Sequence, residues 1–145
     1  PRMRYDLTIN EFAKYLFLKK QLDVFDVTTW RPYIHLVDLV NIVYFFINQK
    51  IKFKSQVYNV GIDGANYTKQ DICNEIIKQL PNRSKFISYI KKPSADKRNY
   101  KVDFSKISKL KIMKKFNLKK GIDEIIFDLK KNKDHQKFKK IFSNI

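Results

Sequence analysis

Glycine and cysteine are scarce in this 145-residue chain, and both scarcities exclude classes of site. The three glycines, at positions 61, 64 and 121, form no G-x-G-x-x-G or G-x-x-G-x-x-G loop, which a dinucleotide pyrophosphate needs for close backbone approach. The single cysteine, Cys73, excludes an internal disulfide and is typical of a reducing compartment, so we expect a cytoplasmic protein. Because Cys73 falls on the apolar face of a predicted helix, we interpret it as a small core residue.

Long apolar runs and metal-binding clusters are also missing from the sequence. The longest apolar stretch, Leu39 to Ile47, is interrupted by Asn41 and is far shorter than the roughly 20 residues that cross a bilayer. No histidine, cysteine or carboxylate cluster has metal-ligand spacing, and no Gly-x-Ser-x-Gly elbow exists. We therefore expect no membrane contact, no metal site and no hydrolase nucleophile.

Positive charge is abundant, with a formal net charge of +17. Lysine supplies most of it, and the charge divides into +8 over residues 1–100 (17 basic minus 9 acidic) and +9 over residues 101–145 (14 minus 5). Two interpretations are open: solvated lysine faces, or an electrostatic footprint for nucleic acid. Because the charge is spread and no nucleic-acid motif accompanies it, we favour the first and consider nucleic acid an unlikely partner.

Hydrophobic periodicity predicts an α/β chain without an internal repeat. Apolar residues at helical spacing indicate five helices, and short apolar runs bounded by turn residues indicate the strands. The first predicted helix is 6–20, with Asp6 as N-cap, and the second is a long helix with Leu36, Leu39, Val40, Val43 and Ile47 on its face. The third is opened by Thr68 and Asp71, buries Ile72, Cys73, Ile76, Ile77 and Leu80, and is broken by Pro81–Asn82. The fourth is 105–110, and the fifth is marked by Ile122, Ile125, Ile126 and Leu129. The predicted strands are 24–25, 33–34, 56–60, 86–90 and 99–102, with a turn at Asp63–Gly64. A final amphipathic segment is marked by Phe138, Ile141, Phe142 and Ile145.

The segment from Trp30 to Asp38, with the sequence W-R-P-Y-I-H-L-V-D, carries the most information. The proline blocks helix and keeps its neighbours extended, which would hold Arg31 at the edge of a strand. A guanidinium is a planar fork of donors that suits a phosphate. Asp38 is placed to cap the helix that follows.

This segment resembles the R-x-x-[IV]-H-V-x-D stretch of extended short-chain dehydrogenases/reductases, the NAD-dependent epimerases and dehydratases of nucleotide sugars. Two further stretches match in the same order: 56–61 (Q-V-Y-N-V-G) resembles the family's F/Y-N-[VI]-G strand, and 96–106 resembles its D-x-R-x-Y-x-x-D-x-x-K segment. The opening, 1–7, resembles the segment after the family's Y-G-P loop. The resemblance thus runs from the first residue to about residue 129, and the chain looks like the C-terminal part of a longer protein.

The resemblance implies an α/β fold, namely the C-terminal substrate-binding lobe of an extended, Rossmann-type enzyme without the N-terminal part of its cofactor domain. Residues 1–130 would be this lobe, and residues 131–145 a basic amphipathic C-terminal helix or tail. The lobe would bind the nucleotide diphosphate of the sugar and pack on the upstream Rossmann portion that holds NAD or NADP, with homodimerisation left open. The substrate-binding residues would be Arg31, Arg98, Lys97, Asn10 and Leu7.

The sequence also departs from the family. The catalytic Tyr-x-x-x-Lys has no match, so we expect the chain alone to be inactive, with no catalytic or cofactor-binding residue of its own. No Gly-Asp-Gly turn precedes Arg31, and Lys92-Pro93-Ser94 replaces the common Arg-Pro-Gly, which keeps a charge and loses the bidentate fork.

Each candidate residue has a plainer interpretation as well. Arg31 could form a surface ion pair, Arg98 and Lys97 could be solvated, and Asn10 could be an exposed helix residue. We interpret His35 as structural, and Asp38 and Asp103 as caps. For the chain as a whole, the alternatives are a non-catalytic remnant of the fold and a basic nucleic-acid-binding module.

Overall fold

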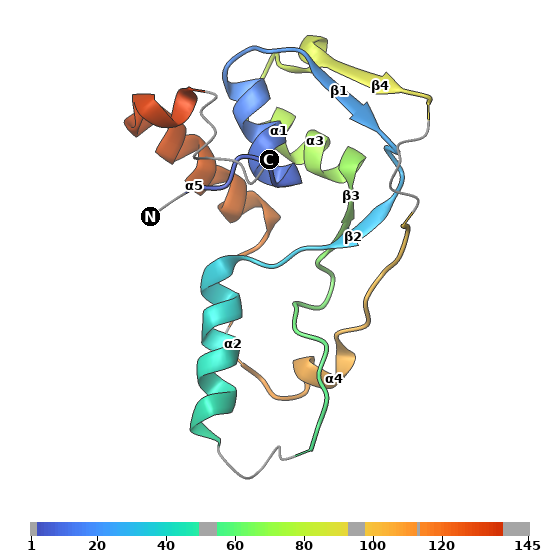
Figure 1. Cartoon of the computed structure of the whole chain (residues 1–145), viewed down its shortest axis with the longest axis vertical. Helices are drawn as coiled ribbons and strands as arrows, with labels where there is room; N and C mark the ends of the chain where they lie inside the picture. Colours follow the sequence, from blue (N-terminus) through green and yellow to red (C-terminus); the bar gives the residue numbers. More distant parts are fainter. Residues whose placement is uncertain (1–2, 50–54, 93–97, 113, 138–145) are drawn as a thin grey trace.

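The structure, a computed structural model, describes residues 3–49, 55–92, 98–112 and 114–137, and shows two bodies joined by a narrow waist (Figure 1). The upper body holds three helices and a strand pair, the lower arm holds one long helix and one short one, and a second strand pair joins them. The elements are α1 (Thr8–Phe17), β1 (Leu22–Phe25), β2 (Trp30–Pro32), α2 (Leu36–Asn48), β3 (Asn66–Thr68), α3 (Lys69–Gln79), the 3-10 turn η1 (Ser84–Phe86), β4 (Ile87–Ile90), α4 (Ser105–Ser108), α5 (Leu118–Lys131) and the 3-10 turn η2 (Lys133–Gln136).

The main core lies in the upper body, where α1, α3 and α5 pack together beside β1. The apolar stripe predicted for the fifth helix is confirmed: Ile122, Ile125, Ile126 and Leu129 are all buried in α5. The stripe predicted for the third helix is confirmed at Ile72, Cys73 and Ile76, whereas Ile77 and Leu80 are only partly covered. Helical periodicity therefore located most of this core.

Cys73 is completely buried in that core, as predicted. Burial raises the pKa of its thiol to about 12, and a hydrogen bond with Tyr89 only partly offsets the rise. The thiolate, which is the reactive form of cysteine, is therefore strongly disfavoured in the folded chain.

The strands form two small pairs rather than one sheet. β1 pairs with β4 in parallel, and β2 pairs with β3 antiparallel with Arg31 opposite Tyr67. The strands predicted at 24–25 and 86–90 are confirmed within β1 and β4, apart from Phe86, which ends η1. The strand predicted at 33–34 is wrong: the paired residues are 30–32, because β3 begins at Asn66, just after the turn at Asp63–Gly64, and Asn66 pairs with Pro32.

The strands predicted at 56–60 and 99–102 are not formed. Both segments are held by side chains instead of by a backbone ladder. The Asn59 amide donates to the Asp103 carbonyl (3.1 Å), and the Asn66 amide bonds both the N–H (2.9 Å) and the carbonyl (3.0 Å) of Val102. Apolar alternation gives these segments strand-like sequences, but regular β-structure also needs a neighbouring strand.

The predicted caps had mixed outcomes. Thr68 and Asp71 form the capping box of α3, as predicted. Asp6 is not the N-cap of the first helix, because α1 begins at Thr8 after Leu7, which has no side-chain cap, and Asp6 pairs with Arg4 instead (2.6 Å). Asp103 lies one residue before Phe104, the N-cap of α4, so it does not occupy the cap position itself; it accepts hydrogen bonds from the Ser105 N–H and hydroxyl, and these bonds lower the pKa of its carboxyl group.

The prediction that the long helix buries its apolar face is wrong. Leu36, Val40, Val43 and Ile47 share one side of α2, and they are 70%, 56%, 48% and 65% exposed. The residues of α2 that are buried instead are Asp38 and Ile42. The sequence pattern correctly identified an apolar face, but nothing in the described part of the chain covers it.

Asp38 is 1% exposed and is not the cap of α2, since His35 takes that position by accepting from the Val37 N–H. The two Asp38 oxygens accept the backbone N–H groups of Lys115 (2.9 Å) and Phe116 (3.1 Å). The carboxylate thus joins the first turn of α2 to the segment leading into α5, and it lies at the positive end of the α2 dipole.

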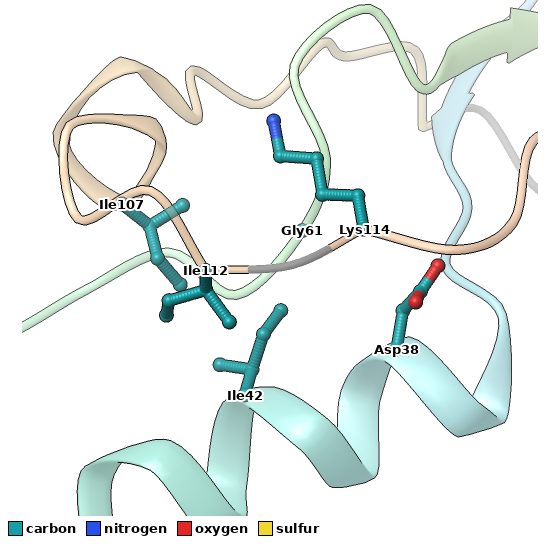
Figure 2. A pocket seen from close by; sticks show the side chains of 6 residues that line it. All are labelled: Asp38, Ile42, Gly61, Ile107, Ile112 and Lys114. Atoms are coloured by element: carbon teal, nitrogen blue, oxygen red, sulfur yellow. The ribbon is translucent and has the colours of Figure 1, made fainter.

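A second, smaller core fixes α2 to α4. Ile42, Ile107 and Ile112 converge beside Gly61 and leave only a cavity of about 10 Å³ (Figure 2). A Cβ atom at Gly61 would lie 2.2 Å from the ring of Phe104, so only glycine fits there. This close packing explains why a glycine must end the Y-N-V-G segment.

The final amphipathic segment predicted around Phe138 to Ile145 lies outside the described residues. In the part that is described, no helix combines the length and apolar character that a membrane crossing requires.

Alanine substitutions at two glycines should change stability in opposite directions. Gly61→Ala should lower the free energy of unfolding by about 2 kcal/mol or more, because the methyl group overlaps the buried Phe104 ring. Gly121→Ala should raise it by up to about 1 kcal/mol, because Gly121 is in α5 and its Cβ would meet His35 at an ordinary 3.7 Å. Urea unfolding followed by circular dichroism would measure both, and equal effects would contradict the proposed packing.

Removal of the Asp38 carboxylate should destabilise the lower arm. Asp38→Ala leaves the partly buried N–H groups of Lys115 and Phe116 without their acceptor, which should cost about 2–4 kcal/mol. Asp63→Ala, at an exposed turn residue, is the matched control and should change stability by less than about 1 kcal/mol. Urea unfolding of both variants would test the assignment, which fails if the two losses are similar.

Candidate anion-binding site around Arg31

Arg31 lies in the middle of β2, at the waist between the two bodies. Because side chains alternate along a strand, Arg31 points to the opposite side from Trp30 and Pro32 and shares its face with Tyr33. Its Nη1 donates to the Trp30 carbonyl (2.8 Å), and its guanidinium lies 5.3 Å from the ring centroid of Tyr100. The segment is extended, as the proline predicted, and Arg31 is held at a strand edge among tyrosines.

The segment carrying Arg98 runs beside β2. The Trp30 N–H donates to the Asn99 side chain (2.9 Å), and the Tyr100 N–H donates to the Trp30 carbonyl (3.4 Å). Arg98, which is exposed, therefore follows the strand of Arg31 closely, although 66 residues separate the two in sequence. Lys97 lies outside the described residues.

The N-terminus of α1 is joined to the same strand. Thr8, the first residue of α1, and Arg31 both lie near enough to Tyr33 to lower the pKa of its hydroxyl group. Leu7 occupies the N-cap position with no side-chain cap, so the first N–H groups of the helix have no capping side chain. An uncapped helix N-terminus attracts anions, and here it lies near a guanidinium.

Two tyrosines near Arg31, Tyr33 and Tyr67, have raised pKa values and so are neutral at physiological pH. Burial raises the pKa of Tyr33, and the Thr8 hydrogen bond and the Arg31 charge offset part of the rise. Burial also raises the pKa of Tyr67, and the nearby carboxylates of Glu75 and Asp71 add to it. Arg31 is therefore flanked by neutral hydroxyl groups that can donate hydrogen bonds to an anionic ligand.

Asn10 holds the segment that leads into α1. Its amide nitrogen donates to the Arg4 carbonyl (2.7 Å) and contacts the sulfur of Met3 at 3.6 Å. The geometry gives Asn10 a local structural role, and its predicted contact with a ligand stays a prediction.

A buried polar cluster anchors the same segment to the C-terminal helix. The Tyr5 hydroxyl donates to Asp128 (3.0 Å), which also accepts from the Asn132 amide and faces a ring nitrogen of His135. The Lys14 ammonium lies 4.4 Å from the Tyr5 ring centroid, and burial lowers its pKa. These contacts fix the approach to Leu7 and hence the position of the α1 N-terminus.

His35 has the structural role predicted for it. It caps α2, its Nε2 lies 3.1 Å from Glu124, and its ring stacks on Phe116 at 3.8 Å between centroids. Within residues 3–49, 55–92, 98–112 and 114–137, no group of three or more histidine, cysteine or acidic side chains could hold a metal ion.

Sequence reasoning missed four residues of this site: Thr8, Tyr33, Tyr67 and Tyr100. Tyr33 follows Arg31 by two positions, so strand alternation could have placed it on the same face. Tyr67 and Tyr100 reach the site through the β2–β3 register and the path of the 98–102 segment, for which the sequence carries no local signal.

Comparison with solved structures gives the fold. A dTDP-glucose 4,6-dehydratase from Bacillus anthracis, in complex with NAD, matches with a TM-score of 0.73 and 20% identity over 91% of this chain and 41% of its own. A UDP-N-acetylglucosamine 4-epimerase from Bacillus cereus matches with a TM-score of 0.62 and 19% identity over 88% of this chain and 42% of its own.

This chain thus spans well under half the length of either structure. No protein-family model matches it. Sequence identity near 20% shows the fold alone. The chain has the α/β fold of the C-terminal portion of extended short-chain dehydrogenases/reductases.

Proposed function

We propose that this chain is the substrate-binding lobe of an NAD(P)-dependent nucleotide-sugar epimerase or dehydratase and binds the diphosphate of its substrate. The observation that carries the proposal is the extended strand position of Arg31, opposite Tyr67 and 5.3 Å from the Tyr100 ring centroid. The N-terminus of α1, which has no side-chain cap, is a second positive feature, and a diphosphate can use both.

Each residue would have a defined task. Arg31 would give two parallel N–H bonds to one phosphate, and the N–H groups that follow Leu7 would bind the other. Arg98, and Lys97 before it, would add charge from the strand-side segment. Asn10 would orient the sugar or phosphate from the first turns of α1.

The cofactor would belong to the portion of the protein that this chain does not span. The dehydratase with the same fold is in complex with NAD, and this chain covers 41% of its length. The residues of this chain do not fit a dinucleotide, because its three glycines form no phosphate loop and Gly61 is filled by the Phe104 ring. The chain would supply recognition, with binding energy from the nucleotide orienting the sugar for chemistry elsewhere.

The exposed stripe of α2, defined as Leu36, Val40, Val43 and Ile47, would contact that upstream cofactor-binding portion. A contiguous apolar stripe on a long helix is unusual on a free surface and marks an interaction site. Val57, which is 82% exposed in a segment with a strand-like sequence, is a further exposed apolar residue that such a contact would cover. A second copy of the chain is the alternative occupant of this stripe.

The lobe would extend to about residue 130, where α5 ends. Residues 131–145 would form a basic extension, and its described part, η2, brings His135 onto Asp128 beside Tyr5.

Lysine and alanine substitutions at Arg31 should separate the contribution of its positive charge from that of its two parallel N–H donors. In the protein that carries this lobe with its cofactor-binding portion, Arg31→Lys should weaken nucleotide-sugar binding by about 1–2 kcal/mol, because it keeps the charge and loses the fork. Arg31→Ala should cost more, and neither change should alter NAD affinity. Calorimetric titration with UDP- and dTDP-sugars and with NAD would measure these effects.

Lys130→Ala is the matched control, since it removes one positive charge from the exposed side of α5. It should leave nucleotide-sugar affinity within about twofold, as expected for a distant, screened charge. Unchanged affinity in Arg31→Ala would remove the proposed diphosphate site.

The stripe of α2 should make the isolated chain associate. Light scattering should detect oligomers of the 145-residue chain, and Val40→Glu with Ile47→Lys should shift it towards monomer because charges interrupt the stripe without changing net charge. Asn74→Glu with Gln21→Lys is a control with the same charges at exposed polar positions. A clean monomer of the unchanged chain would contradict this use of α2.

A further inference from the structure

A groove lies on another side of α2, between the C-terminal half of that helix and the segment before α5. It has a volume of about 460 Å³, which is within the usual range for small-molecule sites. At about 100° per residue, Asn41, Phe45 and Asn48 lie more than about 100° around the helix axis from the exposed stripe. Tyr44, four positions after Val40, lies at the border of the stripe, so the groove adjoins the proposed contact with the cofactor-binding portion along one edge. Its lining consists of Asn41, Tyr44, Phe45, Asn48, Gln49, Lys111, Ile112 and Lys115.

The opposite wall of the groove is strongly basic. Between Phe104 and Ile122 the sequence has seven lysines and no acidic residue, so the charge of the chain is more concentrated here than the sequence analysis assumed. Lys111 and Lys115 both line the groove. Over the residues that the structure describes, neither side chain has a hydrogen-bond or ion-pair partner, whereas Lys106, Lys119 and Lys120 are bonded to their neighbours.

Backbone hydrogen bonds fix the positions from which both lysine side chains start. Lys115 is fixed because its N–H donates to the buried Asp38 carboxylate (2.9 Å). Lys111 has a left-handed backbone (φ 52°), where glycine or asparagine is usual, and its N–H donates to the Ser108 carbonyl. A lysine in this conformation costs stability, and it places its ammonium at the groove.

The other wall carries aromatic and amide side chains. Tyr44 is 68% exposed, and Phe45 lies beside it on the helix. Asn41, Asn48 and Gln49 supply amide groups. The Asn48 nitrogen donates to the Tyr44 carbonyl (2.8 Å), so the Asn48 side-chain oxygen is the atom that can accept a hydrogen bond from a ligand. Exposed rings can stack on a base, and amides can pair with base edges or hydroxyls.

The geometry points to this groove as a second binding site, for a nucleoside phosphate, distinct from the site at Arg31. Its phosphate lies between Lys111 and Lys115, and its base stacks on Tyr44 within reach of the α2 amides. An acidic peptide would bind the two lysines but would not contact the tyrosine ring or the amides. A nucleoside base would contact both, so we expect the groove to select a ligand that carries a base. The same chemistry is offered by a free nucleotide and by a single-stranded nucleic acid.

Photolabelling would test the site directly. The 145-residue chain is irradiated with 8-azidoadenosine 5′-monophosphate, and labelled peptides are mapped by mass spectrometry. The label should fall on peptides that contain residues 41–49 or 111–115, and AMP should compete with it better than inorganic phosphate or a glutamate decapeptide. Label confined to peptides around Arg31, or equal competition by the decapeptide, would overturn the proposal.

Variants separate the groove from the Arg31 site. Lys111→Asn, which tolerates the left-handed backbone, combined with Lys115→Gln should lower labelling and AMP affinity at least about tenfold, as two lost charge-assisted contacts predict. Tyr44→Leu should lower affinity by removing the ring. Arg31→Ala should leave the labelling of peptides 41–49 and 111–115 unchanged, and so should Lys91→Gln with Lys130→Gln, the control for net charge. Circular dichroism confirms that each variant is folded.

A ten-nucleotide single strand identifies the source of the ligand. If it competes more strongly than AMP at the same peptides, the groove serves nucleic acid, and if it competes equally, the groove serves a free nucleotide. Either result supports a nucleoside-phosphate site. Unchanged labelling in the Lys111/Lys115 variant would refute the site, whatever the Arg31 variants show about the proposed substrate.

Discussion

The buried carboxylate of Asp38 is the constraint on which the lower arm depends. One side chain, 1% exposed, accepts two backbone N–H groups from a segment 77 and 78 residues further along the chain. It thereby fixes the direction in which α2 leaves β2, the start of the path into α5, and the position of Lys115 in the groove. A charge is tolerated there because its hydrogen bonds and the α2 dipole replace the water that it loses.

Periodicity located the helices because their buried faces are encoded locally. Ile122 and Leu129 repeat at the spacing that one side of a helix requires, and Thr68 with Asp71 signals a helix start in four residues. It failed at α2, where it identified an apolar stripe that lies open. Apolar spacing shows that a helix has an apolar face. It carries no information about whether another part of the same chain packs against that face.

Long-range pairing explains what the sequence could not predict about the site. The extended geometry of Arg31 follows from Pro32, and Tyr33 follows from strand alternation. The approach of Tyr100 depends on hydrogen bonds between β2 and a segment about 70 residues later, where Asn99 and Asn66 take the place of a ladder. Side-chain amides that replace backbone pairing have no periodic signature, so only the fold reveals the complete site.

The different sides of α2 show why the proposed contacts concentrate on one helix. Its buried side closes a small core against α4, its apolar stripe is open to a partner, and its amide and aromatic side forms a groove with basic residues. A helix normally needs only one apolar face to be stable. The fold of this chain does not require the two additional surfaces, which is why we propose a binding partner for each.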